Sequence, residues 1–205
     1  AADHLIQEQT VFFFFLMEAM LLANKEYMVT FGIVPTSAET GYGYIRKGKP
    51  IAVDKSYLIE DFVEKPDLNT AQLYFASQEF LWNSGMFMFQ THTLIEELNL
   101  HAPDILQCCT KAINNKNEDL DFVRIKKEDF EICRSESIDY ALMEKTNQAA
   151  VIPLNAGWSD VGSWSALWDI EPKDKNGNVV KGDAILQQSY NNYCYADSRL
   201  VTLLG

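Results

Sequence analysis

Short β-prone runs alternate with longer helix-forming runs along most of this 205-residue chain, and this alternation limits its fold more than any other feature. Residues 28–34 and 150–154 are short runs of strand-forming residues, whereas residues 9–24 contain helix formers and neither glycine nor proline. Strands that alternate with helices are typical of layered folds in which helices cover a sheet. We therefore expect an α/β domain with a mostly parallel sheet.

Proline and capping residues predict where further elements begin and end. Pro66 ends a strand that includes residues 62–63, because proline cannot continue a strand's hydrogen bonding. Asn69 or Thr70 is expected to cap a helix that runs to about Gln78. The remaining expected elements are a central strand at residues 86–89 and helices that begin at Thr91, Pro103 and Ser137.

The pattern changes after Trp168. A polar turn with an Asn-Gly step is followed by short β-prone pieces at residues 184–186, 193–195 and 200–204. These pieces are typical of the rungs of a β-solenoid, and three rungs are too few to be stable alone. We expect the α/β domain to occupy residues 1–170 and the start of a β-helix or other β-rich domain to occupy residues 171–205. We expect both ends of the sequence to be cuts within a longer chain.

Composition excludes several classes of function. The net charge of −12 repels nucleic-acid phosphates, and it would also repel a phosphorylated metabolite unless a metal ion, a lysine or backbone N–H groups corrected it locally. The apolar run at residues 11–17 is too short for a bilayer, so no membrane association is expected. None of the four cysteines forms a C-x-x-C pair, which favours reduced thiols and a cytoplasmic location.

A glycine-containing segment is the first candidate site. Glu39, Thr40, Gly41, Tyr42 and Gly43 are consecutive, and two glycines two residues apart remove side chains where a ligand could approach the backbone. A carboxylate can accept hydrogen bonds from sugar hydroxyls, and an aromatic ring can cover the apolar face of a sugar. The alternative is an ordinary turn before a strand.

Two further segments could contact a phosphorylated sugar. Glu64 and Lys65 follow a strand, at the position where open α/β sheets bind ligands; alternatively they form a surface ion pair. Lys65 could neutralise a phosphate and Glu64 could accept from hydroxyls. Asn83 precedes an apolar strand, and a buried amide there would need partners, which a sugar or neighbouring backbone could supply.

Two acidic segments are candidates for a hard cation such as Mg²⁺. Asp160 lies in a glycine-flanked loop just before a helix that Ser163 can cap, although it could simply interact with the helix dipole. Asp3 has the position of a carboxylate at the end of a strand. His4 fits a structural role better than a ligand role.

Together these segments resemble the mannose-1-phosphate guanylyltransferase family. The similar strings occur in a characteristic order and cover nearly the whole chain: AADH, TFGIVPTSAETGYGYI, DFVEKP, FLWNSGMFMF, SIDYALMEKT and PLNAGWSDVGSWSALW. The resemblance implies a nucleotide-transferase α/β domain followed by a small left-handed β-helix. It also implies synthesis of GDP-mannose and pyrophosphate from mannose 1-phosphate and GTP.

The resemblance also implies roles for individual residues. Asp3 and Asp160 would be Mg²⁺ ligands, and Lys65 would hold the phosphate of the sugar 1-phosphate beside that cation. Glu64, Asn83 and the segment from Glu39 to Gly43 would hold the mannose ring. The attacking phosphate oxygen is already ionised, so alignment and charge stabilisation are needed rather than a protein nucleophile.

The chain departs from the family at one point. The family's glycine-rich loop with arginine and lysine, which cradles the triphosphate, has no match in the 205 residues, so the base specificity is not readable. We expect the nucleotide-binding part to precede this segment, and the segment to be inactive alone. The alternative is a non-catalytic sugar-phosphate-binding or regulatory protein. The sequence decides neither whether the protein forms a homo-oligomer nor whether an isomerase domain is fused to it.

Overall fold

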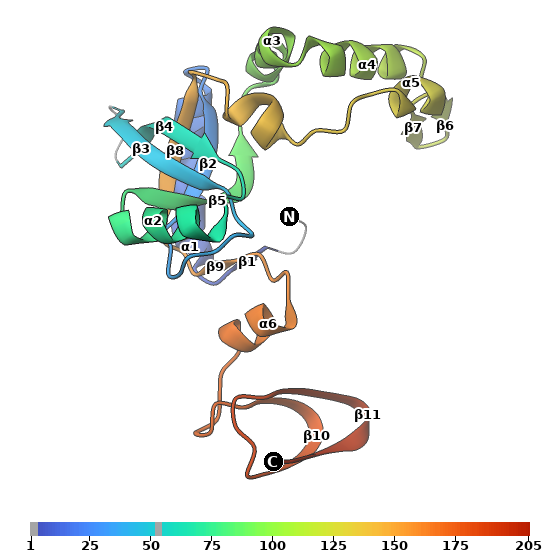
Figure 1. Ribbon diagram of the computed structural model, residues 1–205. Coiled ribbons are helices and arrows are strands. Elements are labelled where there is room, and N and C mark those ends of the chain that lie inside the picture. Colours follow the sequence, from blue (N-terminus) through green and yellow to red (C-terminus); the bar gives the residue numbers. More distant parts are fainter. Residues whose placement is uncertain (1–3, 52–54) are drawn as a thin grey trace. The chain divides into compact units, whose positions relative to one another are not determined.

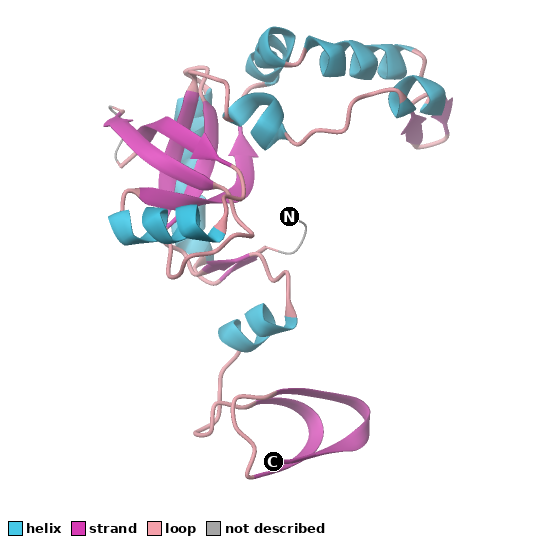
Figure 2. Cartoon of the chain, viewed as in Figure 1, coloured by secondary structure: helices cyan, strands magenta, loops and turns pink. Residues whose placement is uncertain are grey.

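The computed structural model describes residues 4–51 and 55–205, and the chain divides into two compact units (Figures 1 and 2). The larger unit is Gln9–Asn155. The smaller unit combines the residues up to Glu8 with Ala156–Gly205. The sequence predicted that a β-rich domain starts after residue 170, and this domain boundary stays a prediction.

Five strands of the larger unit close into a barrel in the order β2-β5-β3-β4-β8. Only β2 and β8 pair in parallel; each other neighbouring pair is antiparallel. The predicted α/β class is therefore right, but the predicted mostly parallel sheet is wrong. The reason is that the consecutive strands β3 and β4 pair antiparallel, and β5 runs antiparallel to both of its neighbours, β2 and β3. The strands are β2 (Met28–Ile33), β3 (Tyr44–Pro50), β4 (Tyr57–Val63), β5 (Phe80–Met88) and β8 (Ala149–Leu154).

The strand β5 differs from its prediction in a way that matters for function. It begins at Phe80 rather than near Met86, so Asn83 lies inside the strand and not ahead of it. Asn83 is opposite Gly32 of β2, and its neighbour Trp82 is opposite Tyr44 of β3. The polar Asn83 is therefore built into the barrel wall.

The helices α1 and α2 contact the barrel strands. The helix α1 (Gln9–Ala23) packs against β2 and β8, and it buries one face that includes Ala19 and Leu22. Its other face is exposed, with Phe13 63% and Phe14 67% exposed. The helix α2 (Leu68–Ser77) contacts β5.

The N-cap of α2 is Asp67, not Asn69 or Thr70 as predicted. The Asp67 carboxylate accepts a hydrogen bond from the Thr70 backbone N–H at 3.0 Å. A side chain at the N-cap satisfies N–H groups of the first turn, so the N-cap residue lies three residues before the group that donates. The left-handed residue Gln78 ends the helix as expected.

The other elements of the larger unit follow β5 in sequence. Helices begin at Thr91 and Pro103 as predicted. The helix expected after Ser137 is instead a single π-helical turn without a side-chain cap. These elements are α3 (Thr91–His101), α4 (Pro103–Asn114), β6 (Asn117–Asp119), β7 (Phe122–Arg124), α5 (Lys127–Glu131) and η1 (Asp139–Met143).

One hydrophobic cluster joins the barrel to η1 and the end of α3. Its buried members from the barrel include Met28, Ile45 and Phe62, and Leu142 of η1 is completely buried among them. Burying a side chain of this size stabilises the fold by about 1.5–3 kcal/mol. The cluster therefore fixes η1 against the strand ends, and two of the acidic residues described below, Asp139 of η1 and its C-cap Glu144, belong to this turn.

The smaller unit contains two strand pairs and a helix. The strand β1 (Leu5–Ile6) is antiparallel to β9 (Trp158–Ser159), and β10 (Val179–Gln187) is parallel to β11 (Tyr193–Leu204). The helix α6 (Trp164–Ile170) is capped by Ser163, as predicted. The expected turn is present, with the Asp174 carboxylate accepting from two backbone N–H groups at 2.8 Å. Across the described ranges, no helix has the length and apolar character needed to cross a bilayer.

Candidate functional site

Asn83 is the centre of a polar cluster at the end of the barrel. Its side chain is buried, and its backbone N–H donates to the carbonyl of Gly43 at 2.7 Å. The Oδ1 atom accepts from the Thr30 hydroxyl and the Gly85 N–H, both at 3.1 Å, and Nδ2 donates to Asp139 at 3.0 Å. These contacts fix both the position and the orientation of the amide.

Glu64 follows β4 and faces the same cluster. Its side chain is only 9% exposed, and one carboxylate oxygen, Oε1, lies 3.4 Å from the ammonium of Lys65. The other oxygen, Oε2, is buried without a hydrogen-bond partner among the described residues. A buried carboxylate oxygen normally has a partner, so this atom indicates a group that the protein itself does not supply.

The surroundings of Glu64 raise the pKa of its carboxyl above the ordinary value. Burial is the largest cause, and the negative charges of Asp139 and Glu144 act in the same direction. Lys65 opposes them. Glu144 also accepts a hydrogen bond from the Glu64 backbone N–H at 3.1 Å. Three carboxylates and one lysine thus lie within one small region.

Gly43 leaves the space that the Glu64 carboxylate occupies. A methyl group added at Gly43 would collide with Oε2 of Glu64 and would lie 3.3 Å from Cβ of Asn83. Nothing lies within 4 Å of the corresponding position at Gly41, which is exposed. Of the two glycines in the predicted segment, only Gly43 is required by close packing.

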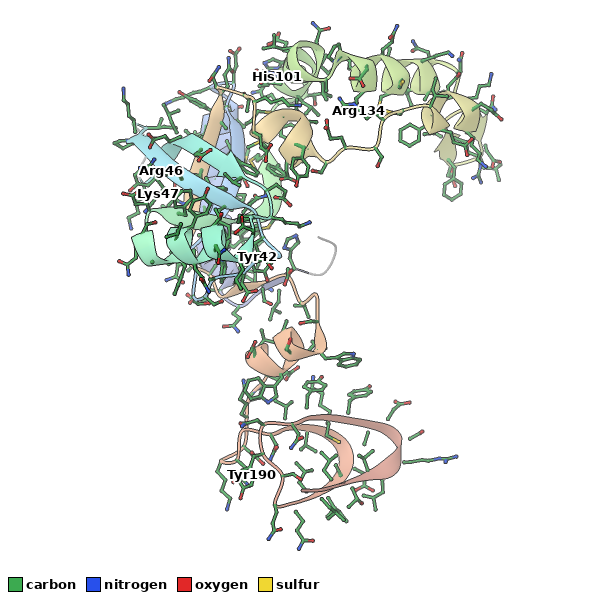
Figure 3. The ribbon with its side chains drawn as sticks, in the orientation of Figure 1. Tyr42, Arg46, Lys47, His101, Arg134 and Tyr190 are labelled. Atoms are coloured by element: carbon green, nitrogen blue, oxygen red, sulfur yellow. The ribbon has the colours of Figure 1, made fainter. Side chains whose placement is uncertain are left out.

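The rest of the glycine segment is less closely involved. Tyr42, labelled in Figure 3, packs on Trp82 with ring centroids 5.1 Å apart, and Trp82 is the residue before Asn83. The recorded partners of Glu39 are Ser37 and Tyr44, both from its own part of the chain. Glu39, Thr40 and Gly41 are exposed. The structure therefore brings together Gly43, Glu64, Lys65 and Asn83, but not Glu39, Thr40 and Gly41.

The backbone at Lys65 is strained. Its φ is +47°, a conformation that residues with a side chain rarely adopt. The strain is unexpected because Lys65 precedes Pro66, and the residue before a proline favours an extended conformation. The lysine side chain is 60% exposed, so its ammonium is accessible to an anion in solution. Strained residues of this kind are concentrated at functional sites.

Asp160 belongs to the smaller unit, where it follows β9. Its neighbour Val161 has φ +45°, a strained conformation for a β-branched residue. The register pairs Leu5 with Ser159, and the Trp158 indole N–H donates to Nδ1 of His4 at 2.8 Å. His4 therefore has a structural partner, as expected. Asp3, the other predicted metal ligand, lies outside the described residues.

Two acidic residues of the cluster, Asp139 of η1 and its C-cap Glu144, were not predicted from the sequence. Asp139 and Glu144 lie in the string SIDYALMEKT, which was used only for the resemblance. Their five-residue spacing would separate them on an α-helix, but the π-helical turn joins them through a 3.0 Å bond from the Glu144 N–H to the Asp139 carbonyl. Thr30 was missed because it lies in an apolar strand. An acidic pair at this spacing is the only sequence signal that could have indicated η1.

Comparison with known proteins identifies the class to which this chain belongs. The nucleotidyl transferase family matches residues 1–177, and the chain belongs to that family. It is 51% identical over 205 residues to a mannose-1-phosphate guanylyltransferase of Salmonella typhimurium, an alignment that covers 100% of this chain and 43% of that protein. It is 49% identical over 208 residues to the mannose-1-phosphate guanylyltransferase of Escherichia coli K12, covering 100% and 44%. The family predicted from the motifs is thereby confirmed, and the chain spans less than half the length of these relatives.

Solved structures agree with this assignment. Mannose-1-phosphate geranyltransferase from Thermus thermophilus superposes with a TM-score of 0.85 at 30% identity, covering 100% of this chain and 58% of that one. Mannose-6-phosphate isomerase from Helicobacter pylori gives 0.71 at 33% identity, covering 77% and 61%. The mixed barrel with its flanking helices is therefore a fold that these proteins share.

Proposed function

We propose that this chain forms the sugar 1-phosphate side of a mannose-1-phosphate guanylyltransferase. Such an enzyme makes GDP-mannose and pyrophosphate from mannose 1-phosphate and GTP. The observation that carries the proposal is the buried Oε2 atom of Glu64, which has no partner among the described residues. A sugar hydroxyl placed beside Gly43 would supply the missing hydrogen bond.

The cluster suits a phosphorylated sugar better than a neutral one. Glu64 accepts from hydroxyl groups, while the fixed amide of Asn83 adds a polar contact beside it. The exposed ammonium of Lys65 binds the phosphate, because it is a mobile point charge next to the carboxylates. Together these residues hold the sugar phosphate so that one phosphate oxygen can attack the α-phosphorus of GTP in line. That oxygen is already ionised, so no base on the protein is required.

Mg²⁺ fits the residues of the smaller unit as a cofactor. Mg²⁺ is typically held by one or two carboxylates together with substrate phosphates. Asp160 supplies one such carboxylate from a loop whose next residue, Val161, is strained. The described residues contain no group of three or more metal-binding side chains, which an all-protein cage would need. When bound, Mg²⁺ would offset the charge of the phosphates; Asp3 is its second proposed ligand.

The C-terminal strands support a β-helix as the second domain. β10 and β11 are consecutive yet parallel, which requires the chain to coil back between them rather than form a hairpin. The buried Asn178, just before β10, is bonded to the segment between β10 and β11. Its Nδ2 atom donates to the Ser189 carbonyl and its Oδ1 atom accepts from the Asn192 backbone N–H, each at 3.0 Å. We propose that these strands begin a left-handed β-helix. We further propose a cytoplasmic enzyme that supplies activated mannose for polysaccharides.

A binding experiment tests the sugar side directly. Isothermal titration of this chain with mannose 1-phosphate should give saturable binding, whereas mannose and inorganic phosphate alone should bind more weakly. Glucose 1-phosphate tests the choice of sugar. No binding of any sugar phosphate would contradict the proposal.

A chimera tests the reaction. This chain would replace the aligned 205 residues of the Salmonella typhimurium relative, and pyrophosphate release from GTP and mannose 1-phosphate would be measured with Mg²⁺. Turnover by the chimera supports the enzyme. A folded chimera that binds mannose 1-phosphate without turnover would favour a non-catalytic binding protein instead.

A further inference from the structure

A cavity lies in the larger unit, apart from the polar cluster around Glu64 and Asn83. Its volume is about 300 Å³, at the lower end of the range that small-molecule sites usually have. Most of the residues that line it are apolar: Val34, Pro35, Phe75, Phe80 and Leu81. The others are Lys47 and Gln78. This cavity, named the apolar pocket, therefore has two polar side chains in an otherwise apolar lining.

The inner walls of the apolar pocket are fixed by packing. The ring of Phe80 stacks on Tyr74 of α2 with centroids 3.8 Å apart, and it meets the buried ring of Tyr44 at 6.5 Å. Leu81 is buried over Gly32, where an added side chain would collide with it. A preformed apolar cavity needs little rearrangement to bind a ligand, so less of the binding energy is lost in ordering it.

The ammonium of Lys47 supplies a positive charge to the apolar pocket. Lys47, labelled in Figure 3, lies on β3, and its Nζ atom is 5.8 Å from the centre of the Tyr57 ring. Across the described residues, no carboxylate forms an ion pair with it. Glu79, which is next to two lining residues, and Glu60 pair instead with Arg46, at 3.0 and 3.8 Å. The charge of Lys47 is therefore available to an anionic ligand.

Gln78 adds a carboxamide at the end of α2. Its φ is +59°, the left-handed conformation with which many helices end. Glycine is the common residue at such a position, so most helices would have no side chain there. The amide nitrogen of Gln78 carries two N–H donors. The apolar pocket therefore offers both a cation and a neutral hydrogen-bond donor.

We propose that the apolar pocket binds a small aromatic carboxylate, with the ring between the apolar walls and the carboxylate at Lys47 and Gln78. An apolar cavity of about 150 Å³ holds one benzene ring, so about 300 Å³ accommodates a ring with a short arm. A carboxylate has one negative charge, which one ammonium can neutralise. A phosphate has nearly two, and apolar walls cannot replace its hydration.

A titration followed by NMR tests the location of the site. Phenylacetate, added to the isotope-labelled chain, should cause saturable shifts at the backbone N–H groups of Lys47, Gln78 and Leu81. The same shifts should appear in the presence of mannose 1-phosphate, because Glu64 and Asn83 do not line the apolar pocket. Shifts that do not saturate, or that are centred on Glu64 and Asn83, would overturn the proposal.

Two further probes test the class of ligand. Phenylethanol keeps the aromatic ring but has no charge, so it should bind at least roughly tenfold more weakly than phenylacetate. Inorganic phosphate should not displace phenylacetate, because it cannot use the apolar walls. Equal binding of phenylethanol would contradict the role of the carboxylate. Displacement by phosphate would indicate a general anion site and would equally contradict the assigned ligand.

Substitution of Lys47 tests the role of the charge. Lys47→Met keeps an apolar stem and removes the ammonium, so phenylacetate should bind roughly tenfold more weakly while the affinity for phenylethanol stays unchanged. Lys49→Met is the matched control, because Lys49 lies on the same strand but does not line the apolar pocket. Equal affinities of the two variants for phenylacetate would contradict the role of Lys47.

A second pair of variants tests the carboxamide without endangering the fold. Gln78→Gly suits the left-handed backbone and removes the amide, so phenylacetate should bind several-fold more weakly while the melting temperature does not fall. Glu26→Gly, at another left-handed residue, is the matched control and should leave the affinity unchanged. A Gln78→Gly protein that binds phenylacetate as tightly as the wild type would contradict the proposed contact with Gln78.

Discussion

The carboxylate of Glu64 occupies the space that a side chain on Gly43 would need. Gly43 immediately precedes β3 and Glu64 immediately follows β4, two strands that pair antiparallel, and the Gly43 carbonyl accepts from the Asn83 N–H. The Glu64 carboxylate is thus held against bare backbone. The sequence indicated a glycine-rich turn and a charged pair, but their contact depends on the pairing of β3 with β4.

Gly43→Ala should therefore disturb the candidate site. The added methyl group displaces the Glu64 carboxylate, and overpacking of this kind costs about 1–3 kcal/mol. We expect a lower melting temperature and weaker binding of mannose 1-phosphate. Gly41→Ala is the matched control, since nothing lies within 4 Å of its added carbon, and it should leave both properties unchanged. Equal effects of the two substitutions would refute the packing argument.

Glu64→Gln should stabilise the protein at neutral pH and weaken its binding of sugar phosphate. The folded pKa of Glu64 is raised above its reference value of 4.5. Its protonation therefore contributes stability that is fully present below pH 4.5 and is lost as the pH rises through the folded pKa. The glutamine does not ionise, so its advantage in melting temperature should be largest at neutral pH and should shrink as the pH falls toward 4.5.

The same variant should lose affinity for mannose 1-phosphate. A hydrogen bond to a charged group contributes about 1.5–3 kcal/mol, so the dissociation constant should rise roughly 10- to 100-fold. Titration calorimetry measures this change, and thermal melts from pH 4 to 8 measure the stability. A variant that is less stable than the wild type at neutral pH would contradict the burial of an ionised carboxylate.

The sequence predicted β2 and β8 well because their apolar runs are short and clearly bounded, but β5 begins six residues before its predicted start and the two pieces predicted at 193–195 and 200–204 form one strand, β11. β2 and β8 begin or end within one residue of their expected limits. The direction in which the strands pair was not predictable in the same way. A short apolar run does not show whether its neighbours in the sheet are parallel or antiparallel to it. The hairpin of β3 and β4 and the long β5 together turned an expected parallel sheet into a mixed barrel.

The candidate site was predictable where a recognisable motif marks it, as for Gly43, Glu64, Lys65 and Asn83. Glu64 and Lys65 were found because they follow β4 directly. Asp139 and Glu144 were not, since a π-helical turn has no sequence period that distinguishes it from an α-helix. The N-cap of α2 was not predictable from the sequence for a similar reason. Three polar residues close together suit the start of a helix: Asp67, Asn69 and Thr70.

Asp139→Ala should weaken the orientation of Asn83. It removes the acceptor of the buried Nδ2 group, and a buried donor without a partner costs about 1–3 kcal/mol. We expect a lower free energy of unfolding and weaker sugar-phosphate binding. Asp139→Asn keeps an acceptor oxygen and should largely restore the stability, while it also reduces the upward shift of the Glu64 pKa. Equal losses in both variants would contradict the hydrogen-bond role.

Asp67→Ala should lower the melting temperature in a pH-dependent way. Hydrogen bonds from Thr70 are the first causes that lower the pKa of Asp67 below its reference value of 3.8. Its contribution to stability is therefore present above pH 3.8 and is lost as the pH falls through the folded pKa. Asn69→Ala is the control and should have little effect, because the Asp67 side chain caps the helix. Thermal melts at pH 7 and pH 3 compare the two variants.

Asp160→Asn should remove the Mg²⁺-dependent activity of the chimera without unfolding it. The substitution keeps the shape of the side chain but removes the negative charge that a hard cation requires. Pyrophosphate release should fall at least roughly 100-fold, and added Mg²⁺ should restore it only in part. Binding of mannose 1-phosphate to the isolated chain should stay unchanged, since Glu64 and Lys65 are intact. Asp169→Asn, on α6 of the same unit, is the matched control, and an Asp160→Asn chimera as active as this control would exclude Asp160 as a metal ligand.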